Sequence, residues 1–503
     1  MKIILSVTPE FFPSTFTWMS PTGLLYLGAV LEREGYNVKV VDPVLEKLAF
    51  DQFIDAIVNE SPDVFSLTVY SDTYFKAVEV FREVKKRLPS VITIAGGPGP
   101  TLLGQGMLEN CKGLDIIVYG EGEAILPEII ERIESKKPLE GIPNISYRND
   151  DQIVNSLRKH LNQNLDDIPF PAYHLVDLSD YKVTFPFNDQ GEIKAINIIT
   201  SRGCPFNCIF CSNTNLNQLR VSYRSVENVI QEIKFLIKTY DIGFFFIQDD
   251  SFNLNKNRIV EFCNALEREK INIRWTCIMR ADKADKDLLK RMKDVGFSGG
   301  CFAIETMNDH IREEVIGKKV TREQIVSTID AFNELDLVCA INWIVSLPDQ
   351  TLQDMYEDLK YIETMKFSNK NSYIALNILR IYPGTRLEIE AKKRGILKDN
   401  FTWFDMSKMI KNSPGTLPGI YGVVPIYREK LSITDIFEAV FRWKYSINYQ
   451  EDPGKSSTLL TYLWLFIVNI KTPADVWNLC SIARAWVRVL LLKLKRKISR
   501  SAI

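Results

Sequence analysis

The sequence has few cysteines and histidines for its length: nine and three, respectively, among 503 residues. The low, odd number of cysteines argues against a disulfide framework, and the N-terminus lacks the layout of a signal peptide, so we expect a cytoplasmic protein. The sequence also has no excess of basic residues, since it contains 62 Lys and Arg and 63 Asp and Glu. The overall charge therefore does not favour binding to nucleic acid. The length favours two or three domains.

Three of the cysteines lie close together, in the spacing Cys204-x3-Cys208-x2-Cys211. They directly follow the apolar strand pattern of residues 195–200, which places all three thiolates on one loop. Iron–sulfur clusters are held by such cysteines, and a cubane needs four ligands. Because the protein offers three, one iron stays open to a molecule that is not protein, which is typical of a catalytic centre.

A structural zinc site is the alternative interpretation of these three cysteines. A structural zinc site usually takes four ligands, and here no second cysteine pair or nearby histidine follows the three. The other six cysteines are scattered singly, mostly in apolar runs, and are expected to be small core residues: Cys111, Cys263, Cys277, Cys301, Cys339 and Cys480.

Residues 1–145 alternate apolar strand patterns with amphipathic helical patterns. This alternation favours a doubly wound, Rossmann-like parallel sheet, in which ligands bind beyond the carboxyl ends of the strands. Strands are predicted over 2–7, 38–42, 63–68, 91–95 and 116–119. Glycine-rich or polar turns at these ends predict a cofactor-binding surface, since glycine lets backbone approach a ligand: Pro21-Thr22-Gly23, Thr68 to Ser71, Gly96-Gly97-Pro98-Gly99 and Gly120-Glu121-Gly122-Glu123.

A second strand–helix series runs from 195 to about 400, after a looser segment at 146–194 that is predicted to be a connector. Its six strands are too few for a full eight-fold barrel, so we expect a partial, open (β/α)6 barrel. The cysteines follow its first strand, at the carboxyl-end face where barrel active sites lie. Further polar residues gather at that face: Gln248-Asp249-Asp250, Arg280, Glu305-Thr306 and Tyr382-Pro383-Gly384-Thr385.

Each of these polar residues also has a purely structural interpretation. Asp249 and Asp250 are good helix N-caps, and Arg280 can pair with Asp282 at the surface. Their shared position at strand ends favours contact with a cofactor or substrate, because all carboxyl ends of such a barrel meet at one face.

The strand–helix pattern stops near residue 400, and 401–503 is predicted to be a mostly helical C-terminal region. Its apolar run at 459–470 is too short to span a bilayer, which needs about 20 residues. From 484 onward, basic residues stand among Trp, Val and Leu without an acid. Two interpretations stay open: a tail that binds anionic lipid peripherally at the inner face of the membrane, or a core-packing helix with a solvated basic end.

The chain resembles the radical S-adenosylmethionine (radical SAM) superfamily, in the subfamily with an N-terminal cobalamin-binding domain. The resemblance covers roughly residues 1–400 and is most specific at the three cysteines, with the aromatic Phe210 before the last of them. Other segments match the usual landmarks of the subfamily: 21–27, Gly96-Gly97-Pro98, Gly120-Glu121-Gly122-Glu123, Ile168-Pro169-Phe170-Pro171, 302–306 and Tyr382-Pro383-Gly384-Thr385.

The resemblance implies a [4Fe-4S] cluster held by Cys204, Cys208 and Cys211, with the amino and carboxylate groups of S-adenosylmethionine (SAM) on the open iron. Reduction by an external flavodoxin- or ferredoxin-like protein would cleave SAM to a 5′-deoxyadenosyl radical, which abstracts a hydrogen from the substrate. With cobalamin present, the substrate radical would take a methyl group.

The resemblance also assigns expected roles to individual residues. Phe210 is expected near the adenine, Gln248 and Asp249 near the methionine amino group, and Glu305 near polar groups of the ribose or methionine. The expected cobalamin-binding residues are Thr22, Gly23, Thr68, Gly96, Gly97, Gly120 and Glu121.

The sequence departs from many cobalamin domains in one respect. Those domains carry Asp-x-His-x-x-Gly, whose histidine is the lower ligand of cobalt. Here the histidines are His160, His174 and His310, none of them within the first 150 residues. We therefore expect cobalamin without a histidine ligand from this domain, and a vestigial domain that binds no cobalamin is the alternative.

The leading hypothesis is a cobalamin-dependent methyltransferase that acts on a small molecule or a lipid. A radical enzyme for cyclisation, rearrangement or carbon–carbon coupling is the nearest rival. A methylthiotransferase is disfavoured, because that class brings a second three-cysteine cluster and only Cys111 lies in the N-terminal domain. A non-catalytic iron–sulfur redox or sensor module is the remote alternative.

Overall fold

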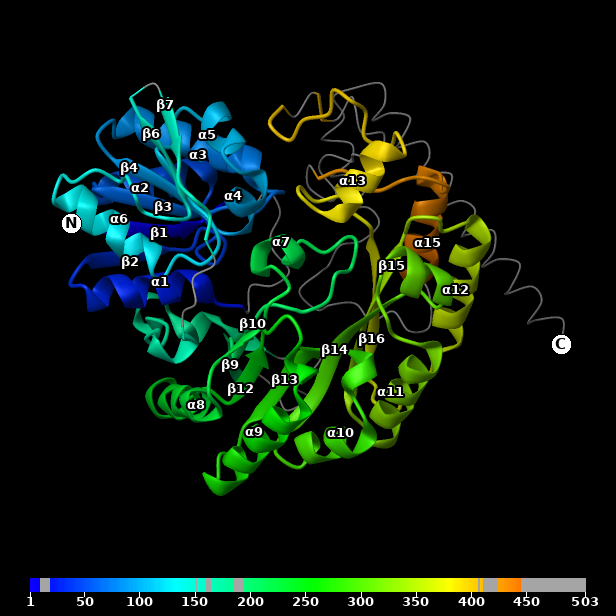
Figure 1. The fold of residues 1–503 in the computed structure, drawn as a ribbon. Helices are drawn as coiled ribbons and strands as arrows, with labels where there is room; N and C mark the ends of the chain where they lie inside the picture. Colours follow the sequence, from blue (N-terminus) through cyan, green and yellow to red (C-terminus); the bar gives the residue numbers. More distant parts are fainter. Residues whose placement is uncertain are drawn as a thin grey trace, which may run out of the picture.

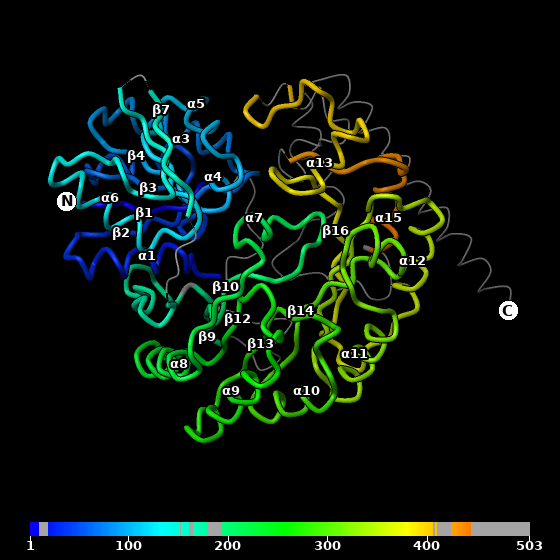
Figure 2. The backbone as a smooth tube through the Cα atoms, viewed as in Figure 1, coloured from blue at the N-terminus to red at the C-terminus, as the bar shows by residue number. Residues whose placement is uncertain are grey.

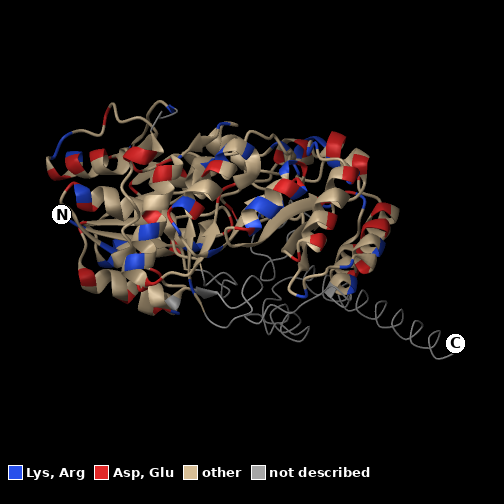
Figure 3. Cartoon of the chain, turned by 90° about the horizontal axis from the view of Figure 1, so that it is seen from below, with Lys and Arg blue, Asp and Glu red and all other residues tan. Residues whose placement is uncertain are grey.

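The computed structural model describes residues 1–9, 19–150, 152–159, 164–183, 193–405, 408–409 and 424–444. Two lobes lie side by side, each built on a seven-stranded sheet (Figures 1 and 2). Acidic and basic residues are interspersed over the helices in view (Figure 3), as expected from their balanced numbers. The apolar run at 459–470 and the basic tail predicted to contact lipid lie outside the described residues.

No helix in the described part of the chain combines the length and apolar character that crossing a membrane requires.

The first lobe is the doubly wound sheet that the sequence predicts, with strand order β2-β1-β3-β4-β5-β6-β7. Its first five strands are parallel: β1 (Lys2–Val7), β2 (Asn37–Val41), β3 (Val64–Thr68), β4 (Ile92–Gly96) and β5 (Ile116–Val118). The helices between them are α1 (Thr22–Arg33), α2 (Phe50–Glu60), α3 (Tyr74–Arg87), α4 (Pro98–Leu103), α5 (Gly106–Asn110) and α6 (Ile125–Glu134).

Both faces of this sheet are covered, because successive strand residues point to opposite sides. Ile3 and Leu5 of β1 belong to the apolar cluster that includes residues of α1 and α6. Ile4 belongs to the opposite cluster, with residues of α2, α3 and α5. Each strand therefore needs a continuous run of apolar residues, and these runs made the five strands recognisable in the sequence.

Two strands within the predicted connector 146–194 extend this first sheet. β6 (Ile145–Asn149) pairs antiparallel with β5, and β7 (Gln152–Asn155) pairs antiparallel with β6. A third short strand, β8 (Lys182–Val183), pairs antiparallel with the second sheet. The segment is thus part of both sheets rather than a plain connector. β7 was hidden in the sequence because it is an edge strand without a fully buried residue.

The second lobe is a partial barrel, with strand order β16-β15-β14-β13-β12-β9-β8. Its six parallel strands correspond to the six predicted: β9 (Ile193–Ile198), β12 (Phe244–Ile247), β13 (Arg274–Met279), β14 (Phe297–Glu305), β15 (Val338–Val345) and β16 (Tyr373–Ile378). Outside the curve lie α8 (Val226–Tyr240), α9 (Lys256–Arg268), α10 (Lys286–Lys293), α11 (Arg322–Glu334) and α12 (Leu352–Thr364) (Figure 1). β9 and β16 are not neighbours, so the barrel stays open.

The described parts of the region after residue 400 pack against both lobes. The helix α15 (Ile433–Lys444) contributes Ile436 and Phe437 to an apolar cluster with Met355 and Leu359 of α12. The Phe404 ring packs edge-on against Tyr74 of the first lobe, with 5.6 Å between the ring centroids. It fits there because Gly106 has no side chain: a Cβ at that position would lie 2.4 Å from the Phe404 ring.

Asp358 of α12 anchors the chain just beyond the carboxyl end of β14. Its carboxylate accepts hydrogen bonds from the Thr306 hydroxyl (2.7 Å), the Met307 backbone N–H (2.8 Å) and the Gln350 amide (3.2 Å). Burial raises the pKa of Asp358 to about 6, because desolvation of the charged form outweighs these hydrogen bonds.

We expect the stability of the protein to decrease between about pH 4 and pH 6 through Asp358. The folded state binds the proton of the Asp358 carboxyl more tightly than the unfolded chain does. The stabilisation from this proton is therefore fully present below the ordinary pKa of 3.8, and it is lost as the pH rises through about 6. Each pKa unit corresponds to about 1.4 kcal/mol. Asp358→Asn should flatten the pH dependence of the thermal midpoint in this interval, and a variant with the wild-type slope contradicts the assignment.

Candidate active site

The three clustered cysteines lie on a loop between β10 (Ser201–Arg202) and α7 (Asn213–Asn217), beyond the carboxyl end of β9. All three are partly exposed. Backbone hydrogen bonds hold the loop across the mouth of the barrel: Ile209 N–H donates to the Ile316 carbonyl (3.0 Å), and Leu387 N–H donates to the Ile209 carbonyl (2.9 Å). The loop is therefore fixed by the segment between β14 and β15 and by the helix α13 (Arg386–Lys393), which follows β16.

The turn before the first cysteine depends on Gly203. Its φ of +91° lies in the left-handed region, and an added Cβ would stand 2.0 Å from the Arg220 carbonyl oxygen. Only glycine fits this close approach of two backbones. The Gly203 N–H also donates to Asp250 (2.9 Å), which ties the cysteine loop to the end of β12.

The donor set fits an iron–sulfur cluster better than a single metal ion. Among the described residues, no three His, Cys, Asp or Glu side chains stand close enough together to hold one ion. In a cubane, however, each cysteine binds a different iron, so its three sulfurs stand further apart. Burial raises the pKa of all three thiols, that of Cys211 to about 11. Thiolates therefore need a nearby positive charge, which bound iron supplies.

A buried ion pair stands beside this loop, at the end of β14. Lys318 Nζ binds Glu305 Oε1 (2.8 Å) and the Ala303 carbonyl (2.6 Å), and both side chains are almost fully buried. Glu305 adopts φ +70°, a strained conformation for a residue with a side chain, and such strain is common at functional sites. In the sequence Lys318 was indistinguishable from a solvated lysine, since Gly317-Lys318-Lys319 carries no apolar pattern.

Arg280 also faces the loop, with its guanidinium 3.5 Å from the centroid of the Phe206 ring. It binds Asp282 (2.8 Å), as the structural interpretation of the sequence allowed, but the pair is buried rather than on the surface. Lys318 and Arg280 both lower the pKa of Cys204 and Cys208, against the larger effect of burial. The carboxylates of Asp250 and Glu305 act in the opposite direction, on Cys204 and Cys208 respectively.

The end of β12 supports the loop rather than capping a helix. Asp249 accepts hydrogen bonds from the Thr200 backbone N–H, the Thr200 hydroxyl and the Ser201 hydroxyl, each at 2.6 Å. It is almost fully buried, and burial raises its pKa. Gln248 accepts a hydrogen bond from Asn197 of β9 (2.7 Å). Contact of Asp249 and Gln248 with SAM remains a prediction.

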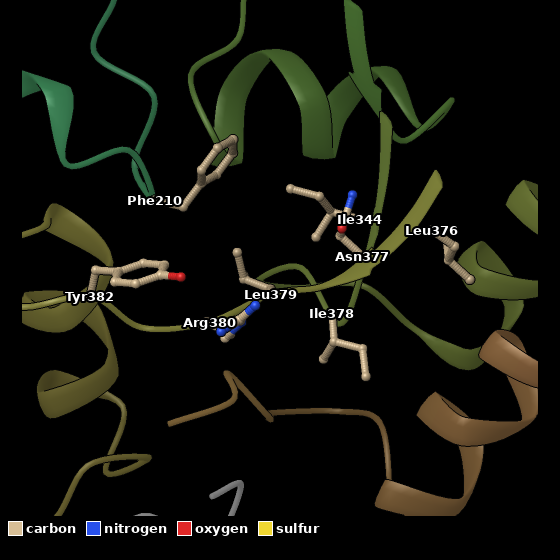
Figure 4. A pocket seen from close by; sticks show the side chains of 8 residues that line it. All are labelled: Phe210, Ile344, Leu376, Asn377, Ile378, Leu379, Arg380 and Tyr382. Atoms are coloured by element: carbon tan, nitrogen blue, oxygen red, sulfur yellow. The ribbon is translucent and has the colours of Figure 1, made fainter. Parts of the chain in front are cut away.

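Phe210 lines a cavity of about 240 Å³ between the ends of β15 and β16 (Figure 4). Phe210 and Tyr382 form one side of the cavity, and Ile344 and Leu379 add aliphatic surface. Asn377 and Arg380 give it polar groups. Contact of Phe210 with the adenine of SAM remains a prediction.

The first lobe carries its glycine-rich turns at one edge of its sheet, as predicted. Gly23, Gly96 and Gly120 lie at the carboxyl-end side of β1, β4 and β5, and no heavy atom would lie within 4 Å of a Cβ added to any of them. This open surface suits a large planar ring. Thr68 ends β3, and Gly97, with φ +92°, lies beside it, because its Cβ would stand 3.0 Å from Thr68 Cγ2.

Two other predicted cobalamin-binding residues contact the second lobe. Thr22 Oγ1 accepts a hydrogen bond from Asn197 Nδ2 of β9 (2.6 Å). Glu121 forms an ion pair with Arg202 of β10 (3.1 Å), two residues before Cys204. The edge predicted to bind cobalamin is thereby joined to the loop predicted to bind the cluster. Neither Asn197 nor Arg202 was singled out in the sequence.

Comparison with known proteins agrees with this arrangement. The B12 binding domain matches residues 16–130, and the radical SAM superfamily matches residues 198–362. An uncharacterized methyltransferase of Pyrococcus horikoshii is 31% identical over 368 residues, 73% of this chain and 77% of that protein. The anaerobic magnesium-protoporphyrin IX monomethyl ester cyclase of Rubrivivax gelatinosus is 25% identical over 348 residues, 68% of this chain and 61% of that protein.

Among solved structures, the radical S-adenosylmethionine methyltransferase TsrM from Kitasatospora setae, with cobalamin and a [4Fe-4S] cluster bound, has the same fold. The match has a TM-score of 0.70 at 15% identity and covers 97% of this chain and 99% of that one. The partial barrel and its cysteine loop define a radical SAM enzyme. The chain belongs to the radical SAM family that carries an N-terminal cobalamin-binding domain, and its cofactors are a [4Fe-4S] cluster, SAM and cobalamin.

Anaerobically purified protein should carry one cluster, and replacing Cys204, Cys208 and Cys211 together by Ala should remove it. Iron and acid-labile sulfide should fall to background, because no other described group can hold the irons. Cys263→Ala is the matched control, since this cysteine is buried in α9 away from the loop. A triple variant that keeps its full iron content would contradict the assignment.

Cobalamin bound to the protein should give a base-off spectrum, because the first 150 residues contain no histidine to bind cobalt. His174 is exposed and engaged with Glu32 (3.0 Å), and His160 lies outside the described residues. The variants His160→Ala and His174→Ala should therefore leave the absorption spectrum unchanged. A histidine-bound spectrum that disappears in either variant would show that the prediction is wrong.

Proposed function

We propose that this enzyme transfers a methyl group to an unactivated carbon of a small molecule or lipid. The observation that carries the proposal is the junction of the two lobes, where the open glycine edge and the cysteine loop are joined through Thr22–Asn197 and Glu121–Arg202. A substrate bound there would meet a radical-generating centre and a methyl-carrying cofactor together. The relative from P. horikoshii, named a methyltransferase, supports this direction.

When bound, the cofactors supply the hydrogen-abstracting radical and the methyl group. The residues of the chain supply binding, orientation and exclusion of water. Cys204, Cys208 and Cys211 hold the cluster, and the cavity beside Phe210 binds the adenosine part of SAM. Lys318 provides positive charge beside the cluster loop, where the pair it forms with Glu305 is shielded from solvent.

Further parts of the proposal concern the partners. The reductant is an external one-electron donor of the flavodoxin or ferredoxin type, since the described residues offer no second group of cysteines. The substrate is a small molecule or a lipid. The basic tail after residue 484 is the part of the chain suited to contact with a membrane surface.

A second candidate function is radical cyclisation without methyl transfer. It is favoured by the cyclase of R. gelatinosus, which matches 68% of this chain. Both functions use the same cysteine loop and the same cofactor-binding edge. The reactions differ in the fate of the methyl group of SAM, which makes them separable by experiment.

The test uses the full chain, reconstituted anaerobically with iron, sulfide and cobalamin, with SAM labelled in its methyl group, titanium(III) citrate, and metabolite and lipid extracts. Methyl transfer predicts 5′-deoxyadenosine, S-adenosylhomocysteine and label in a product. Cyclisation predicts 5′-deoxyadenosine with no label in any product. The triple cysteine variant should give neither nucleoside product, and a wild type that forms neither 5′-deoxyadenosine nor S-adenosylhomocysteine would leave only a redox or sensor role.

A further inference from the structure

Arg202 joins the two lobes through two carboxylates, the partly exposed Glu121 and the buried Glu123. Its Nη1 binds Glu121 (3.1 Å) and its Nη2 binds Glu123 (2.6 Å), both from the turn that follows β5 of the first lobe. The Arg202 side chain is only 16% exposed and that of Glu123 7%. The guanidinium also lies 5.3 Å from the centroid of the Tyr26 ring of α1. A planar guanidinium can bind two carboxylates at once, which the ammonium of lysine does less well.

The residues around Arg202 leave its backbone little freedom. Asp249 binds the residues just before it, through Thr200 and Ser201, and Asp250 binds Gly203 just after it. At Gly203 the backbone passes so close to the Arg220 carbonyl that a side chain would not fit. Any displacement of Arg202 is therefore passed directly to Cys204. The same pair of carboxylates follows Gly120, whose open surface faces the predicted cobalamin site.

A second buried contact joins the lobes at the other side of that surface. Asn197 Oδ1 accepts hydrogen bonds from the Ser20 N–H (2.7 Å) and hydroxyl (2.8 Å), and its Nδ2 donates to Thr22 and Gln248. Asn197 is 1% exposed. Both the Gly23 and the Gly120 sides of the open surface are thus attached to the second lobe within a few residues of the glycine.

We propose that Arg202 is a positioning residue. Its ion pairs with Glu121 and Glu123 fix the glycine-rich edge of the first sheet, where cobalamin is expected, relative to the cluster loop. This inference rests on the proposed function and deepens it. It also changes the role expected for Glu121, from a cofactor ligand to a contact between the lobes. Arg202 is required for reactions that involve both cofactors, and it is dispensable for reactions that involve only the cluster and SAM.

Two products of SAM separate these reactions without a known substrate. One electron from the cluster breaks the bond between sulfur and C5′ and releases methionine. The 5′-deoxyadenosyl radical then takes a hydrogen atom from a C–H bond of the buffer or the protein and becomes 5′-deoxyadenosine. S-Adenosylhomocysteine forms when reduced cobalamin, with its cobalt electron pair, takes the methyl group of SAM. Titanium(III) citrate supplies the electrons for both. Holoenzyme incubated with SAM and this reductant therefore reports the two reactions side by side.

Arg202→Gln and Glu123→Gln should lower the rate of S-adenosylhomocysteine formation by about 10- to 100-fold, since a displacement of about 1 Å can cost that much. Formation of 5′-deoxyadenosine should stay within about twofold of wild type. The double variant should be no worse than Arg202→Gln alone, because the two residues act through each other. Arg202→Lys should recover part of the rate. Arg291→Gln is the matched control, since it removes an ion pair with Glu267 (2.6 Å) on α9 and α10, away from the lobe junction.

A second readout needs no turnover. With the cluster reduced and cobalamin held as cob(II)alamin, pulsed EPR measures how strongly the cluster relaxes the cobalt electron spin, which depends on their separation. Arg202→Gln should weaken the relaxation of the cobalt spin or broaden the distribution of its rates, whereas Arg291→Gln should leave it unchanged.

The outcomes separate this inference from the proposed function. Variants that match wild type in both products and in spin relaxation overturn the role of Arg202 and leave the function standing. Loss of cluster iron or of bound cobalamin in Arg202→Gln also overturns it, because a positioning residue leaves both cofactors in place. A wild type that forms 5′-deoxyadenosine but no S-adenosylhomocysteine contradicts the proposed function instead.

Discussion

Parallel strands bring all their carboxyl ends to one edge of a sheet, and here two such edges meet at a single junction. Everything else in the site follows from this arrangement. The cysteine loop leaves β9 at the edge of the barrel, and the turn after β5 leaves the edge of the first sheet. Arg202 and Asn197 join the two where they meet. Neither lobe alone would place a cluster and a corrin ring beside the same substrate.

The junction is stable because its buried charges are paired. An isolated buried charge is costly, whereas a pair with additional hydrogen bonds is tolerated. Lys318 has Glu305 and a backbone carbonyl, and Arg202 has two carboxylates. Asp249 forms no ion pair within the described part of the chain, but three hydrogen bonds at its carboxylate compensate for its burial. These partners come from distant parts of the chain, so the pairs also determine how the elements fit together.

Much of the fold could be predicted from the sequence because buried parallel strands need continuous apolar runs. The five strands of the first sheet and the six of the barrel were found in this way, and the cysteine spacing indicated the superfamily that residues 198–362 match. β6 and β7 were missed, since β6 has polar residues among its buried ones and β7 has no fully buried residue, so neither forms such a run. Lys318, Arg202 and Asn197 were missed for another reason. Their importance lies in contacts across the fold, and nothing in their local sequence distinguishes them from surface polar residues.

The contact of Phe404 with Gly106 has a consequence for how the molecule is assembled on the ribosome. The strands and helices of the first lobe lie early in the chain, so this lobe can collapse while the barrel is still being synthesised. The Phe404 ring can pack against Gly106 and Tyr74 only after nearly 300 residues beyond Gly106 have emerged. This contact therefore forms last among those that join distant parts of the fold described above, whereas Asn197 and Arg202 are synthesised in time to join the lobes earlier. The Phe404 contact can close only onto a first lobe that is already folded.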